Sequence, residues 1–233
     1  MSLVTYHITS DHKDILRGSA KLACSFWNYF LEPKQPIVIR LGTFSRFGNT
    51  IARAYRPYSQ DGVRYGVVEF NKRYLNSFDE EEIVGTLIHE IAHTLGMGWD
   101  KWMQLFSATT GKFHKKYVRQ LPELKNMLVE TDYGPGTTLS HWDESRFDQE
   151  IMSGFKDDDE YVLPVTVNVF ELLGHTIVTK LNKKTPLREL LDRVRGMQFS
   201  STGKLASIDR TAYIETELWE EIYENKRTKA PMS

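Results

Sequence analysis

The sequence has little of what marks a disulfide-stabilised, membrane-spanning or nucleic-acid-binding protein. Cys24 is the only cysteine among 233 residues, so no internal disulfide can form. No apolar run approaches the length of about 18 residues that a membrane-spanning helix needs, so we expect no membrane span. The formal net charge is -1, which excludes a strongly positive surface field and argues against nucleic acid as a partner.

The first residues also lack the features of a secretory leader. Residues 1–14 have neither a basic n-region nor an apolar h-region, so we expect no signal peptide there, and the sequence leaves the compartment open. The length suits one domain, or one domain divided by a cleft. Hydrophobic residues make up 40% of the chain and charged residues 26%, which is typical of a folded protein with a sizeable core.

The order of apolar patterns predicts an α+β fold with a mixed, twisted sheet in its first half. Apolar residues spaced by three and four predict a helix over residues 12–31, and Pro33 and Pro36 end it. Three runs rich in β-branched and aromatic residues predict strands at 36–44, 50–58 and 65–71. Later apolar periods predict helices near 101–108, 112–130, 185–196 and 209–226, and a buried helix, or a helix running into a strand, at 163–178.

The segment SFDEEEIVGTLIHEIAHTLG, residues 77–96, predicts one further helix. Ser77 or Asp79 can cap its start, and acidic residues fill its first turn, where they interact favourably with the helix dipole. Gly96 can end it with a sharp turn that other residues adopt only at a cost.

This helix contains the spacing H-E-x-x-H. His89 and His93 are four residues apart, so they project from one face and can bind one zinc ion through two imidazole nitrogens. Glu90 lies one position on, beside the metal rather than on it. There its carboxylate can act as general base toward a water activated by the zinc.

A catalytic zinc commonly has three protein ligands, and the third is not obvious here. An extended form of the motif places it where Trp99 stands, and an indole cannot ligate; Asp100 is one residue too late to point correctly. The downstream candidates are His114, Glu123, Glu130, His141 and His175. A glutamate from a later helix would make Glu123 or Glu130 the ligand, whereas His141 follows a glycine-rich loop that could return the chain to the metal.

The residues that follow the motif resemble a known family. After H-E-x-x-H-x-x-G come VETDYGPGTTLSHWDE, FDQEIMSG and LPVTVNVFELLGHTI, in an order that is similar to the catalytic domain of leishmanolysin-type peptidases, within the metzincin clan. The resemblance covers about residues 65–177. It implies that His141 is the third zinc ligand, that residues 97–140 are an insertion, and that Met152 forms a Met-turn whose thioether packs beneath the metal.

The same resemblance implies a zinc-dependent endopeptidase with Glu90 as general base and one catalytic Zn²⁺. Residues after Met152, including Gly154 and Phe155, would then line the substrate pocket. It also implies action outside the cell or within an exported assembly. From the strand pattern we further predict that a substrate peptide pairs with an edge strand at Val67 to Phe70.

These inferences divide the chain into two parts. Residues 1–184 are predicted to form a metzincin-like catalytic domain, with halves at 1–97 and 98–184 and a cleft between them. Residues 185–233 are predicted to be a helical extension that docks a partner or packs on the catalytic domain. The alternative function is a non-catalytic structural or assembly protein that retains a zinc-peptidase fold; the intact Glu90 favours the enzyme.

Overall fold

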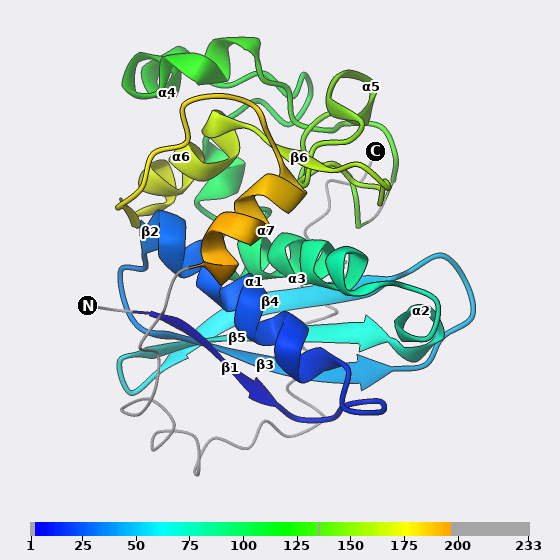
Figure 1. The fold of residues 1–233 in the computed structure, drawn as a ribbon. Coiled ribbons are helices and arrows are strands. Elements are labelled where there is room, and N and C mark those ends of the chain that lie inside the picture. The colour runs from blue at the N-terminus through cyan, green and yellow to red at the C-terminus, as the bar shows by residue number, and fades with distance from the viewer. Residues whose placement is uncertain (1–2, 135, 197–233) are drawn as a thin grey trace.

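A four-stranded mixed sheet forms the base of the molecule in Figure 1. The computed structural model describes residues 3–134 and 136–196. The strands are β1 (Val4–Ile8), β3 (Ile37–Phe44), β4 (Ala52–Gln60) and β5 (Val63–Asn71), in the order β1-β3-β5-β4. Strands β1, β3 and β5 are parallel, and β4 runs antiparallel to β5. The predicted α+β class and mixed sheet are therefore confirmed, although the sequence reasoning missed β1.

Two long helices cover one face of this sheet (Figure 1). Helix α1 (Leu16–Phe30) connects β1 to β3, and α3 (Glu80–Leu95) follows β5 after the short α2 (Lys72–Leu75). The helix predicted over 12–31 begins only at Leu16, because Lys13 and Asp14 have positive φ angles of 61° and 57° that an α-helix cannot contain. The carboxylate of Asp11 accepts from the N–H of Leu16 and closes this start.

Helix α3 begins and ends where its sequence provides the chemistry for it. Of the two predicted caps, the structure selects Asp79: its side chain accepts from Glu82 N, and the Glu82 carboxylate accepts from Asp79 N, which completes a capping box. Gly96 ends the helix with φ at 129°. Between these points α3 lies close over β5, because the absence of a side chain at Gly66 leaves room for Thr94.

The chain after α3 is much less regular. Its helical pieces are η1 (Trp102–Gln104), α4 (Lys115–Gln120), η2 (Pro122–Asn126), α5 (Glu144–Phe147), α6 (Pro164–Leu173) and α7 (Leu187–Arg195). The paired strands are β2 (Leu31–Glu32) with β7 (Thr176–Ile177), and β6 (Tyr161–Val162) with β8 (Thr185–Pro186).

Two predicted helices in this region were too long. The residues at 101–108 form only η1, and those at 112–130 form α4 and η2 with a break between them. Pro122 explains the break, because proline lacks an N–H to continue α4 and disfavours helical backbone at the residue before it. The segment at 163–178 is a buried helix running into a strand, α6 and then β7, as predicted.

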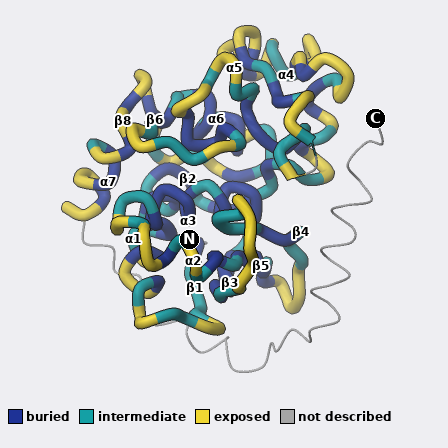
Figure 2. Tube along the Cα trace, turned by 90° about the vertical axis from the view of Figure 1, so that its right-hand side faces the viewer, coloured by how far each residue is buried: buried dark blue, intermediate teal, exposed yellow. Residues whose placement is uncertain are grey.

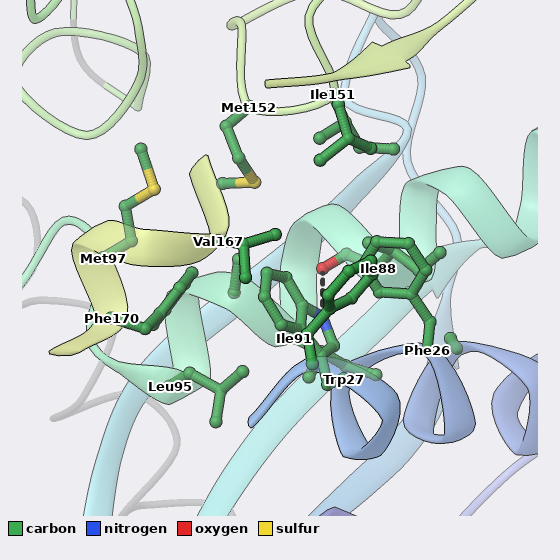
Figure 3. Close-up of a cluster of buried hydrophobic side chains, with 14 of the residues drawn as sticks. Phe26, Trp27, Ile88, Ile91, Leu95, Met97, Ile151, Met152, Val167 and Phe170 are labelled. Atoms are coloured by element: carbon green, nitrogen blue, oxygen red, sulfur yellow. Dashed lines mark hydrogen bonds between the residues drawn. The ribbon is translucent and has the colours of Figure 1, made fainter. Parts of the chain in front are cut away.

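One hydrophobic core joins the regular and irregular parts. Figure 3 shows Phe26 and Trp27 from α1, Ile88 and Ile91 from α3, and Val167 and Phe170 from α6 around a common centre, with Ile151 and Met152 reaching it from a loop. The indole N–H of Trp27 donates to Ile88 O at 3.0 Å, so α1 is bonded to α3 as well as packed on it. Along the trace in Figure 2, α3 is largely buried between these layers.

Helix α7 belongs to the same core. The buried apolar face of this helix consists of Leu187, Leu190, Leu191 and Val194. On its exposed side Arg188 pairs with Glu81 at 2.9 Å. Residues 187–195 therefore pack against the main body, as one of the two predicted alternatives has it. The helix predicted at 209–226 lies outside the described residues. Within 3–134 and 136–196, none of the helices combines the length and apolar composition that a bilayer span requires.

Candidate metal centre

Helix α3 presents two of the predicted ligands side by side. His89 and His93 are one turn apart, and their Nε2 atoms lie 3.1 Å from each other. Glu90 is buried, with 8% of its surface exposed. Helix geometry places Glu90 about 100° around the axis from His89 and about 60° from His93, so it stands next to the pair without overlapping it.

His141 completes the cluster from a distant part of the chain. Its Nε2 atom lies 3.0 Å from that of His89 and 3.2 Å from that of His93. The three nitrogens are close enough to bind one metal ion. In the described part of the chain, no other group of three or more histidine, cysteine or acidic side chains meets this condition.

Each of the three rings is held at its other nitrogen by a backbone carbonyl. The Nδ1 atoms of His89, His93 and His141 lie 2.7, 3.0 and 2.8 Å from the oxygens of Ile151, Met97 and Thr137, in that order. A carbonyl oxygen can only accept, so each Nδ1 carries the proton and donates it. The neutral ring then leaves Nε2 as an acceptor, and three acceptors converge on one point. A cation satisfies that arrangement.

Two glycines shape the turn that supplies one of these carbonyls. Gly96, with φ at 129°, reverses the chain so that Met97 O faces back toward the His93 ring. Gly98 has φ at 86°, and a Cβ there would stand 3.1 Å from Ser140 Cβ and 3.4 Å from His93 Nδ1. The short spacing between α3 and the loop that carries His141 therefore requires glycine at this position.

The other candidates for the third ligand lie in different contacts. Glu123 accepts from Asn168 Nδ2 at 3.3 Å, His175 Nε2 bonds Leu95 O at 2.7 Å, and Asp100 pairs with Arg56. His114 is exposed at the start of α4. Burial lowers the pKa of His175 to about 4, so this ring packs in its neutral form.

Glu130, the other runner-up, holds the loop of His141 instead of ligating. It is buried, with 1% exposed, and its carboxylate accepts from Asp132 N at 2.7 Å and Glu144 N at 3.0 Å. Its backbone also pairs with the loop, because Glu130 N donates to His141 O at 3.0 Å. The sequence analysis named Glu130 only as a candidate ligand; the fold shows that backbone N–H groups satisfy its carboxylate.

Met152 lies in a tight turn, while the role as a Met-turn beneath a metal, which the resemblance implies, stays a prediction. The turn closes where Ser153 N donates to Glu150 O at 2.8 Å, and the Met152 side chain is fully buried in the cluster of Figure 3. Two bonds attach the turn to His89 and to the residue after His141: His89 Nδ1 donates to Ile151 O, and Trp142 N donates to Met152 O at 3.0 Å.

The prediction that Val67 and Phe70 contact substrate was wrong. Both lie in β5, which is paired with β3 on one side and β4 on the other, and they are 1% and 0% exposed. The period of the strand could not reveal this, since an interior strand and an edge strand share the same alternation. Among the described strands the sheet ends at β4 on this side.

Of the two predicted pocket residues after Met152, Gly154 packs inside the protein and Phe155 is exposed. The N–H of Gly154 donates to Glu144 at 3.1 Å, and the backbone at Gly154 lies directly against Thr137, so this residue supports the loop of His141. Phe155 is 51% exposed. Its ring meets that of Tyr133, 54% exposed, with centroids 5.2 Å apart, an aromatic pair that the sequence reasoning missed.

No protein-family model matches this chain, and no curated protein matches it in sequence.

Proposed function

We propose that this protein is a zinc-dependent endopeptidase of the leishmanolysin-like, metzincin type. The observation that carries the proposal is the convergence of three Nε2 atoms within 3.2 Å of one another, each on a ring oriented by a backbone carbonyl. The buried carboxylate of Glu90 stands beside them on α3. Three histidines with a neighbouring carboxylate are a donor set typical of catalytic zinc.

The spacing of the nitrogens suits zinc. Tetrahedral zinc with metal–nitrogen bonds of about 2.0–2.1 Å would hold its nitrogens about 3.3 Å apart. The observed separations of 3.0, 3.1 and 3.2 Å need only a small outward movement to reach that value. Three ligands leave a fourth position for water or substrate, as catalytic zinc sites do.

The roles of the residues follow from this arrangement. His89, His93 and His141 hold the ion, which when bound supplies Lewis-acid chemistry: it polarises a carbonyl and lowers the pKa of a coordinated water. Glu90 accepts the proton of the attacking water and later delivers it to the amine nitrogen that leaves. Hydrolysis of a peptide bond is then balanced, with the water oxygen added to the carbonyl carbon and the proton carried to nitrogen.

The position of β4 supports an extended peptide as substrate. This strand is the antiparallel edge of the sheet and packs against α3, the helix of the metal ligands. An edge strand offers N–H and C=O groups with which a peptide can pair. We therefore assign substrate alignment to β4 in place of β5. Of the predicted substrate-pocket residues, we keep Phe155 in the proposal, because its exposed ring next to Tyr133 is accessible to a substrate side chain.

The experiment compares metal content and peptide cleavage in the same preparations. We expect about one zinc per wild-type chain and cleavage of a quenched peptide library or casein. Glu90→Gln should retain zinc and lose cleavage by at least about 100-fold, as expected for removal of a general base. His141→Ala should lose both. Glu123→Gln, an exposed carboxylate away from the cluster, is the matched control and should change neither.

Two results would contradict the proposal. Absence of stoichiometric zinc in the wild type would remove its basis. Retained zinc with no cleavage that depends on Glu90 would support the alternative, a non-catalytic structural or assembly protein with a peptidase fold.

A further inference from the structure

Glu150 is a buried acid held entirely by hydrogen-bond donors. It is 1% exposed. One carboxylate oxygen, Oε2, accepts from Met152 N at 2.7 Å, and the other, Oε1, accepts from Leu163 N at 3.0 Å and Thr166 Oγ1 at 2.6 Å. Three donors on a buried carboxylate make a rigid arrangement, because losing any of them leaves charge or a polar group unsatisfied in the interior.

The first of these bonds falls on the peptide group that orients a metal ligand. Met152 N and Ile151 O belong to one peptide unit, which is planar, with its N–H and C=O pointing in opposite directions. The N–H end donates to Glu150, and the C=O end accepts from His89 Nδ1 at 2.7 Å. The carboxylate of Glu150 and the imidazole of His89 therefore bind opposite ends of the same planar peptide group.

We propose that Glu150 is a positioning residue of the metal centre, which aligns His89 through the Ile151–Met152 peptide. The inference rests on the proposed function, since it treats His89 as a ligand. A negative charge at the N–H end polarises the peptide and makes the carbonyl oxygen a stronger acceptor. The stronger acceptor holds Nδ1–H more firmly and raises the basicity of the ligating nitrogen, as a carboxylate in direct contact with a metal-bound histidine does.

A second set of bonds connects Glu150 to the loop of His141. The indole N–H of Trp142 donates to Thr166 Oγ1 at 2.9 Å, and that hydroxyl donates on to Glu150. Trp142 directly follows His141 in the chain, and its indole is fully buried. One carboxylate thus lies between the peptide that orients His89 and the residue next to His141.

A purely structural role is the competing explanation, because Leu163 and Thr166 lie at the start of α6 and Glu150 also caps that helix. Loss of a cap lowers stability but leaves the properties of a bound metal unchanged. The two explanations therefore differ in the metal affinity and in the spectrum of a metal at the site.

The test uses Glu150→Gln in the full chain. Glutamine keeps the shape, but its NH₂ group must face either Met152 N–H or Leu163 N–H, so one donor loses its acceptor. Burial raises the pKa of Glu150 to about 7 against the lowering effect of its three donors. The measurements are therefore made at pH 8, where most of the wild-type carboxyl is ionised. We expect zinc to bind about tenfold more weakly in competition with a chelator, and the visible absorption of bound Co²⁺ to shift.

Two further comparisons separate positioning from stability. Glu69→Gln removes charge from another largely buried carboxylate, which Arg53 and Tyr55 contact, and should lower the melting temperature without changing zinc affinity or the Co²⁺ spectrum. Thr166→Val removes one donor to Glu150 and should weaken zinc binding about threefold, with Thr166→Ser restoring it. This second pair decides the matter if Glu150→Gln does not fold.

Wild-type zinc affinity and an unchanged Co²⁺ spectrum in a folded Glu150→Gln or Thr166→Val protein would overturn the inference while leaving the proposed function intact. A wild-type protein that binds neither zinc nor Co²⁺ would overturn the proposed function, and the inference with it.

Discussion

The three histidines of the candidate metal centre come from two regions, and each region fixes the position of its histidines in a different way. His89 and His93 stand on α3, whose own backbone hydrogen bonds define their spacing. His141 stands in an irregular segment, where the backbone of Glu130 and the turn at Met152 pair with it and its neighbour. In the second region, buried carboxylates accept from backbone N–H groups that no helix or long sheet satisfies.

The comparison shows which interactions position a side chain when the backbone around it is not in a helix or a long sheet. A helix places side chains by its period and needs support only at its ends. An irregular segment has unsatisfied backbone donors throughout, and each must find a partner before the segment can hold one shape. Glu130, Glu144 and Glu150 supply those partners on the side of His141.

The largest expected effect is the loss of metal binding on removing a ligand from either region. His93→Ala and His141→Ala should each weaken zinc binding by more than about 100-fold, since even partners of ligands contribute about 10–100-fold.

The two regions should differ in the metal-free protein: on removal of the metal, amide exchange should accelerate over residues 130–153 and stay slow over 80–95. Equal acceleration in both would show that α3 depends on the metal as much as the loops do.

The next effect distinguishes a buried carboxylate from an exposed one in the irregular region. Glu130→Ala leaves Asp132 N and Glu144 N without their acceptor and should lower the free energy of unfolding by about 3–6 kcal/mol, since each of these two bonds to a charged group contributes about 1.5–3 kcal/mol. Glu123→Ala, which is exposed, should change it by less than about 0.5 kcal/mol. Denaturant unfolding of the metal-free proteins measures both values.

A third prediction concerns pH at the contact between the regions. His175, from the irregular half, bonds Leu95 O near the end of α3, and burial lowers its pKa to about 4, with the positive charges of Arg64 and Lys101 contributing. The unfolded chain binds a proton below about pH 6.5 and the folded chain does not, so stability is lost as pH falls from 6.5 toward 4, by up to about 3 kcal/mol. His175→Gln should remove this slope in metal-free protein. An identical slope in wild type and variant would contradict the assignment.

The smallest effect is expected at the start of α3. Asp79→Ala removes the acceptor of Glu82 N, which is one of the two bonds of the capping box, and should cost about 1 kcal/mol of stability. Zinc affinity should stay within about twofold, because the histidines lie in about the last two turns of a helix that core packing also holds. A tenfold loss of affinity would mean that the ligands of the regular region depend on distant support, as His141 does.

Much of the regular region was predictable from local patterns. Strands β3, β4 and β5, helices α1 and α3, and the end of α3 at Gly96 all follow from the spacing of apolar residues and from local capping chemistry. The misses have a physical cause in common. Strand β1 is short, and the helices predicted at 101–108 and 112–130 form only short pieces, because tertiary packing overrides weak local propensities there.

The choice of the third ligand shows the limit of residue spacing. Spacing left five downstream candidates open; the likeness to a family selected His141, and the structure brings that residue to the other two histidines. The partners of the rings could not be predicted, since Ile151 O, Met97 O and Thr137 O are backbone atoms that any residue could supply. Val67 and Phe70 were misplaced for a related reason: strand order is a property of the sheet and not of one strand.

The sequence by itself determined the pair of histidines with the intervening Glu90, because the period of a helix is a local property that four residues suffice to express. Only the tertiary structure decided that His141 meets them, that β4 rather than β5 forms the edge of the sheet, and that Glu150 holds the far end of the peptide that His89 contacts. These relations join residues far apart in the chain, and they exist only after the hydrophobic core has brought the two regions together.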